Sequence, residues 1–110
     1  MDVRERVVLS VGGSVVNPGS ETGPVLDTKG LDNLANLIND MSREFALGIV
    51  VGGGATARAY ISAARSLGAS EVYADELGIL ATRMNAALML QCLLSKGADV
   101  FPNVCSVHMD

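Results

Sequence analysis

The chain has 110 residues, a net charge of −4, 49% apolar residues and 18% charged residues. This length fits a single domain spanning 1–110, and the apolar content excludes an intrinsically disordered chain. The acidic balance, with no basic block and only 4% aromatic residues, disfavours a protein that binds nucleic acid.

The N-terminal segment and the cysteines favour a cytoplasmic protein. Residues 1–6 mix charges, and the apolar run after them is broken by Gly12 and Gly13, so the run lacks the features of a signal peptide. No uninterrupted apolar run reaches the ~18 residues of a membrane span, so we expect no membrane association. Cys92 and Cys105 form no Cys-x-x-Cys motif and are expected to be reduced thiols.

The first half of the chain predicts two buried strands separated by a loop and a helix. Residues 6–11 are rich in valine and end at glycines, and residues 47–51 repeat this pattern. Residues 12–28 are rich in Gly, Pro, Ser and Asn, and a loop of this length suggests a function. Residues 30–45 carry apolar residues at helical spacing.

The second half predicts two helices and a short strand. Residues 56–67 are alanine-rich and helical, with Gly68 placed to end the helix. A longer helix is expected over 75–95, followed by a third short strand over 98–101. The resulting order, β-α-β-α-α-β, predicts an α/β protein with three αβα layers and a mainly parallel sheet.

Both strands of the first half are followed at once by glycines. In a parallel sheet these turns lie beyond the carboxyl ends of the strands, where such folds bind ligands. Glycine lets the backbone approach a ligand, and successive free N–H groups bind anions. The turn at 52–54 also opens a helix with a partially positive N-terminus, and Arg58 lies one turn further on. We therefore predict a phosphate site at turns 12–14 and 52–54, the alternative being two ordinary strand-to-helix turns.

The second turn also fits a dinucleotide-binding fingerprint. Residues 52–57 match Gly-x-Gly-x-x-Gly/Ala, and Asp75 follows at about the 20-residue spacing of that motif. In that fold the acidic residue ends a strand, whereas Asp75 is expected to open a helix, so NAD binding is the weaker interpretation. Asp75 is then either a helix cap or a carboxylate that accepts hydrogen bonds from a ribose. Gly78 costs a helix about 1 kcal/mol relative to Ala, which indicates close approach of a base or of another chain.

Three segments together resemble the amino acid kinase superfamily, and within it the archaeal-type UMP kinases. They are Leu-Ser-Val-Gly-Gly-Ser-Val at 9–15, Val-Val-Gly-Gly-Gly-Ala-Thr-Ala-Arg at 50–58 and Asp-Glu-Leu-Gly-Ile-Leu-Ala-Thr-Arg-Met-Asn-Ala at 75–86. The third segment is the most specific, and the resemblance covers most of the chain. It implies transfer of the γ-phosphoryl group of ATP to UMP, with Mg²⁺, giving UDP for pyrimidine nucleotide synthesis.

The resemblance also implies roles for individual residues. On the acceptor side, Gly53 would offer its N–H to the UMP phosphate, and Asp75 would hold the UMP ribose. No residue is expected to ligate a metal. His108 is expected to lie in a tail without a catalytic role.

On the donor side, Gly13 and Ser14 would lie along the ATP phosphates. Gly54 and Arg58 would sit where the donor and acceptor phosphates meet. Arg58 is the expected catalytic residue, because phosphoryl transfer needs alignment and charge neutralisation rather than a covalent nucleophile.

Two departures from the family pattern shape the expectation. Ala55 stands where family members often carry Lys, which removes a cation beside the phosphates. Family members are also longer, and their second half, with most of the ATP site, has no counterpart here. We therefore expect the N-terminal, acceptor half of a UMP kinase, inactive as an isolated chain and a homo-oligomer, hexameric by resemblance.

Two other functions remain open at this point. One is another kinase of the superfamily, acting on a carboxylate, a carbamate or isopentenyl phosphate. The other is a non-catalytic nucleotide-binding or assembly module. Arg83 either pairs with Glu76 or points into the cleft.

Overall fold

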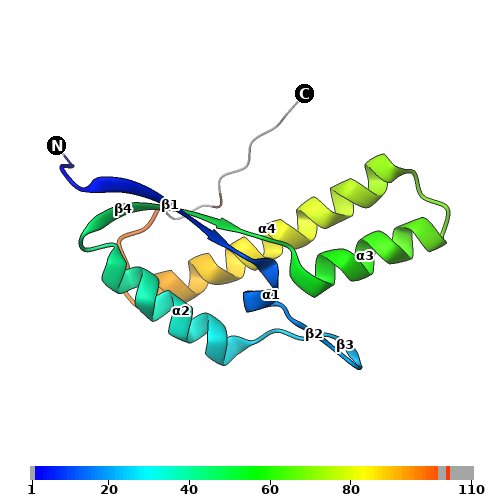
Figure 1. Ribbon diagram of the computed structural model, residues 1–110, viewed down its shortest axis with the longest axis horizontal. Helices are drawn as coiled ribbons and strands as arrows, with labels where there is room; N and C mark the ends of the chain where they lie inside the picture. The colour runs from blue at the N-terminus through cyan, green and yellow to red at the C-terminus, as the bar shows by residue number, and fades with distance from the viewer. Residues whose placement is uncertain (1, 102–103, 105–110) are drawn as a thin grey trace.

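The computed structural model describes residues 2–101 and 104 of the chain. It contains a parallel pair of strands, a small antiparallel hairpin and helices that pack mainly below the parallel pair (Figure 1). The elements in chain order are β1 (Glu5–Val11), α1 (Gly13–Val16), β2 (Gly19–Ser20), β3 (Gly23–Pro24), α2 (Thr28–Met41), β4 (Phe45–Val51), α3 (Gly54–Ser66) and α4 (Glu71–Ser95). The α/β class and the parallel sheet are thus confirmed.

The register of the parallel pair decides where the glycine turns lie. β1 and β4 both have seven residues, and they pair from Glu5 opposite Phe45 to Val11 opposite Val51. The two strands therefore end at the same level. The turns that follow them emerge together at one edge of the sheet.

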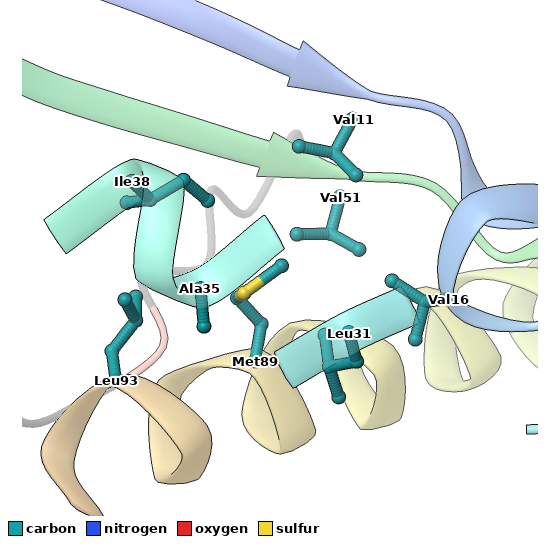
Figure 2. Packing of buried hydrophobic residues seen from close by; sticks show 8 residues of the cluster. All are labelled: Val11, Val16, Leu31, Ala35, Ile38, Val51, Met89 and Leu93. Atoms are coloured by element: carbon teal, nitrogen blue, oxygen red, sulfur yellow. The ribbon is translucent and has the colours of Figure 1, made fainter. Parts of the chain in front are cut away.

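The core lies between one face of the sheet and helices α2 and α4. Val11 and Val51 point from the strand ends toward Leu31, Ala35 and Met89 of the helices (Figure 2). The opposite face is open, with Val8 74% exposed and Val50 58% exposed. The described residues thus build the sheet and one covering layer of helices, and they leave the second face of the sheet uncovered.

Helices α3 and α4 end in the same way. Gly68 and Gly97 adopt positive φ angles of 84° and 73°. Each glycine N–H, and the N–H of the residue after it, donates to a carbonyl of the last helical turn, as in a Schellman motif. The glycine expected to close the first of these helices does so.

Two boundary predictions were wrong. Residues 98–101 form no strand in the described structure, because Ala98 donates its N–H to Leu93 O at 3.1 Å and so still belongs to the end of α4. Asp75 does not open α4, because Ser70 is the N-cap and its Oγ accepts from Tyr73 N at 3.3 Å. The expected loop at 12–28 contains α1 and the β2–β3 hairpin.

Helix α4 is long and apolar enough, by length and composition alone, to cross a membrane. In this structure one side of it is buried against the rest of the protein. The buried positions are Ala74, Gly78, Ala81, Asn85, Met89 and Leu93.

Candidate functional site

The two glycine turns are in direct backbone contact. A Cβ added to Gly13 would overlap Gly54 N, and it would lie 2.6 Å from Gly52 C. Gly54 has a φ of +61°, and a Cβ there would lie 2.6 Å from Gly13 O. Glycine at 13 and 54 is therefore required first by the packing of one turn on the other.

Asn17, just after α1, caps the start of α3 from outside the helix. Its backbone carbonyl accepts from Ala55 N at 2.9 Å, and its Oδ1 accepts from Thr56 N at 2.6 Å. Its Nδ2 donates to Val25 O at 3.0 Å, and the residue is only 1% exposed. The N-cap residue itself, Gly53, has no side chain that could accept hydrogen bonds from these amides.

Asn85 of α4 holds the other side of the second turn. Its Nδ2 donates to both Gly52 O and Gly53 O, each at 3.0 Å. The residue is 4% exposed and lies on the buried side of α4. A buried asparagine from each of two distant segments thus fixes the backbone at 52–56.

These contacts limit which N–H groups can meet an anion. An α-helix leaves its first N–H groups without helical partners. In α3 the amides of Ala55 and Thr56 are already bonded to Asn17. Within the described part of the chain, Gly53 N and Gly54 N donate no hydrogen bond. The anion-binding capacity of this helix start is therefore confined to those two amides.

Arg58 and Ser14 are both exposed beside this backbone site. Arg58 lies one turn into α3, four positions after Gly54, and helical side chains lean toward the helix N-terminus. Among the described residues Arg58 makes no ion pair. Its guanidinium can therefore reach back toward the amides of Gly53 and Gly54.

Asp75 lies on α4, exposed, one turn before Gly78. Gly78 is next to the second turn, since a Cβ on Gly53 would lie 3.5 Å from Gly78 O. The close approach expected at Gly78 is made by Ile61 of α3, whose Cδ1 would lie 2.8 Å from an added Cβ. No base or second chain is needed to explain that glycine.

Charged groups near the site are few in the described structure. Arg83 makes no ion pair with Glu76 there, and it lines a groove along β4 instead. Arg65 pairs with Glu71 at 2.9 Å, at the far end of α3. This hydrogen-bonded pairing lowers the pKa of Glu71 and raises the pKa of Arg65, to which the nearby Asp75 carboxylate adds a smaller effect. Arg58 is thus the free cation closest in sequence to the glycine turn among the residues described.

A groove of about 590 Å³ runs along β4, α4 and residues 98–101. It shares Val51 and Thr82 with the neighbourhood of the second turn, but none of the glycines at 12–13 or 52–54 lines it. The candidate site is therefore a backbone surface at the end of the sheet rather than this groove.

The sequence reasoning missed Asn17 and Asn85. Asn85 carried a readable signal, because it interrupts the otherwise small or apolar buried stripe of α4. A polar residue on such a stripe must find hydrogen-bond partners. Asn17 stood in a loop rich in polar residues and carried no such signal.

Comparison with known proteins identifies the fold. The profile of the Amino acid kinase family matches residues 5–104. The chain belongs to the amino acid kinase family. This family member is 41% identical to the uridylate kinase of Methanoculleus marisnigri, over 96% of this chain and 42% of that protein.

Solved structures agree with this assignment. The amino acid kinase chain matches the uridylate kinase of Archaeoglobus fulgidus with a TM-score of 0.68 and 39% identity, over 81% of this chain and 37% of that one. It matches the UMP kinase of Ureaplasma parvum with a TM-score of 0.74 and 25% identity, over 86% of this chain and 39% of that one. The chain thus spans about two fifths of the length of these relatives.

The same structure disfavours the dinucleotide alternative. Asp75 lies inside α4, and no strand lies between α3 and α4 in the described residues. A dinucleotide-binding fold needs its acidic residue at the end of the strand after the glycine-rich turn. His108 lies outside the described residues.

Proposed function

We propose that this chain is the UMP-binding half of a UMP kinase, which transfers the γ-phosphoryl group of ATP to UMP and gives UDP for pyrimidine nucleotide synthesis. One observation carries the proposal: the glycine turn at the start of α3, which holds two unbonded amides, packs directly against the glycine turn that follows β1. Phosphoryl transfer requires the donor and acceptor phosphates to be held side by side, and two adjoining glycine turns are suited to that task. The uridylate kinase relatives support UMP as the acceptor.

On the acceptor side, we assign the UMP phosphate to the amide of Gly53. The partial positive charge at the start of α3 favours a phosphate at this position. Asp75, exposed on α4, accepts hydrogen bonds from the ribose hydroxyls. Its carboxylate is suited to this role because an ionised carboxylate is a hydrogen-bond acceptor only.

On the donor side, Gly13 and Ser14 lie along the ATP phosphates. Gly54 and Arg58 meet the transferring phosphoryl group. Arg58 stabilises the negative charge on the equatorial oxygens of that phosphoryl group by two parallel N–H hydrogen bonds, which a lysine could not reproduce. Transfer then follows from alignment and charge neutralisation.

Kinases usually bind ATP together with Mg²⁺, which neutralises charge on the phosphates. The described residues contain no group of three His, Cys, Asp or Glu side chains that could hold a metal. Mg²⁺ in kinases is held largely by water, the substrate phosphates and one or two carboxylates, and we assign none of the residues of this chain to the ion.

The proposal is tested by titrating the ¹⁵N-labelled chain with UMP and following its amide signals by NMR. We expect the largest shifts at Gly53, Arg58 and Asp75. Arg58→Ala and Asp75→Ala should each weaken UMP binding more than tenfold, about 1.4 kcal/mol, with the fold retained. Arg65→Ala and Glu76→Ala are the matched controls, because they remove the same kinds of charge from exposed positions of the same helices.

Wild-type affinity in both Arg58→Ala and Asp75→Ala would refute the site. Titrations with ATP, NAD and acceptors of related kinases, namely a carbamate and isopentenyl phosphate, test the substrate. UMP should bind most tightly, and stronger binding of another acceptor would move the chain to a different kinase of the family. The isolated chain should show no turnover in a coupled ATP-consumption assay.

We also propose that the protein is a cytoplasmic homo-oligomer, hexameric as a complete enzyme. Exposed apolar side chains gather on α3 and α4, where Tyr60, Leu80 and Met84 line one hollow. Such a patch is typical of an interface between subunits. Sedimentation velocity should show self-association of the wild-type chain, reduced in a Leu80→Asp variant, and a strictly monomeric wild type would count against the proposal.

A further inference from the structure

Asn85 is not among the residues assigned to substrate, yet its side-chain nitrogen binds the carbonyls of Gly52 and Gly53, two consecutive residues of the glycine turn. We propose that Asn85 is a positioning residue that aims the amides of Gly53 and Gly54 at the bound phosphate. This inference rests on the proposed phosphate site and adds the device that orients it.

The argument follows from the geometry of the peptide bond. The described chain has no cis peptide bonds. In a trans peptide the C=O and the following N–H point in opposite directions. Because the carbonyls of Gly52 and Gly53 both point to Asn85 Nδ2, the amides of Gly53 and Gly54 both point away from it. Gly53 O also accepts from Ala57 N at 3.3 Å, so the start of α3 helps to hold the second of these peptides, whereas Asn85 is the side chain that bonds to both.

The fit between Asn85 and the two carbonyls leaves little freedom. A side-chain amide nitrogen carries two hydrogens, one for each carbonyl. Both bonds measure 3.0 Å, and the residue is 4% exposed, so water competes poorly for them. Glycine peptides rotate more easily than others, so a turn of three glycines needs such an external restraint to keep its amides aligned.

Asn17 makes this orientation specific. It occupies the next two amides, those of Ala55 and Thr56. A phosphate at this helix start can therefore use only the pair that Asn85 orients. Loss of Asn85 would leave the carbonyl of Gly52 without this partner and the carbonyl of Gly53 held only by the 3.3 Å bond from Ala57 N, so the two amides would no longer be fixed together.

The test compares Asn85→Ala with Met89→Ala in the full 110-residue chain. Met89 lies one turn further along α4, is 2% exposed and belongs to the apolar core. Its side chain has no hydrogen-bond donor, so it cannot hold the carbonyls of the glycine turn as Asn85 does. Both variants lose buried atoms from the same side of α4. Binding of UMP and of inorganic phosphate is followed by NMR and corrected for the folded fraction.

We expect Asn85→Ala to weaken UMP and phosphate binding at least tenfold per folded molecule, with Met89→Ala within twofold of wild type. Selective ¹⁵N-glycine labelling gives a second readout. Without ligand, the signals of Gly53 and Gly54 should shift and broaden in Asn85→Ala but not in Met89→Ala. Wild-type binding together with unchanged signals of these glycines in Asn85→Ala would overturn the inference.

The two readouts separate this inference from the proposed function. If wild type binds neither UMP nor phosphate, the proposed function fails, and the ligand-free glycine signals alone decide whether Asn85 orients the turn. If wild type binds but Asn85→Ala binds equally well, only the positioning role fails. A wild-type spectrum without dispersion would overturn both, because the chain would then hold no turn to orient.

Discussion

The two ends of helix α3 are held in different ways. At its start, buried asparagines from two other segments bond to the backbone, and a second glycine turn packs against it. At its end, a Schellman turn at Gly68 and an exposed ion pair between Arg65 and Glu71 lead into α4. Buried neutral hydrogen bonds are costly to break, whereas exposed ion pairs contribute little. The end held by buried hydrogen bonds is the one where we place the phosphates, and the far end connects α3 to α4.

The largest effect should come from breaking the contact between the turns. In Gly13→Ala the new methyl group would overlap the backbone of Gly54, so both turns must move apart. We expect a loss of about 3 kcal/mol in the free energy of unfolding, measured by urea denaturation.

Gly12→Ala is the control for this prediction. A Cβ at Gly12 would meet only Ser14 Oγ, at 4.0 Å, and the residue is exposed. Its stability should stay within about 0.5 kcal/mol of wild type. If both variants lose the same free energy of unfolding, the contact between the two turns is not the reason for glycine at position 13.

A smaller effect should come from removing the outside cap of α3. Asn17→Ala leaves the amide of Thr56 and the carbonyl of Val25 without their buried partner, so we expect a loss of about 2 kcal/mol. Hydrogen exchange at Thr56 should accelerate in the same variant. Asn33→Ala, at an exposed position of α2, should change neither the stability nor the exchange rate at Thr56. If Asn17→Ala is as stable as Asn33→Ala, the hydrogen bonds of Asn17 do not stabilise the fold.

The smallest effect should come from the far end of α3. Hydrogen bonding to Arg65 lowers the pKa of Glu71 below its ordinary value in the folded state. A depressed pKa stabilises the fold above the unfolded value, and this stabilisation is lost as pH falls through the folded-state pKa. Wild type should therefore melt slightly above Glu71→Gln at neutral pH, with the gap closing under acid. High salt should narrow the same gap, and a gap independent of both pH and salt would contradict the ion pair as its source.

The sequence predicted the parts of the site that are local. Valine runs ending in glycine predicted both strands and both turns, and Arg58 lies exposed one turn into the helix that follows the second turn. The helix closed by Gly68 also ends as expected, because its signal is local: glycine readily adopts the positive φ that a helix end of this kind requires.

The roles of Asn17 and Asn85 could not be predicted from the sequence, because their hydrogen-bond partners lie far along the chain. Asn17 binds Thr56, 39 positions away, and Asn85 binds the turn 32 and 33 positions before it. Such contacts exist only once the register of the sheet and the crossing of α3 with α4 are set. The start of α4 differs from the prediction for a simpler reason, because Ser70 rather than Asp75 caps this helix.

The equal length of β1 and β4 restricts how this protein can vary over evolution. Gaining or losing one residue in either strand would reverse which side chains face the core and would pull the two turns out of level. Between the two strands, insertions should be tolerated best at the exposed β2–β3 hairpin and the start of α2. Natural variants should accordingly differ in length between the two strands while each strand keeps its seven residues.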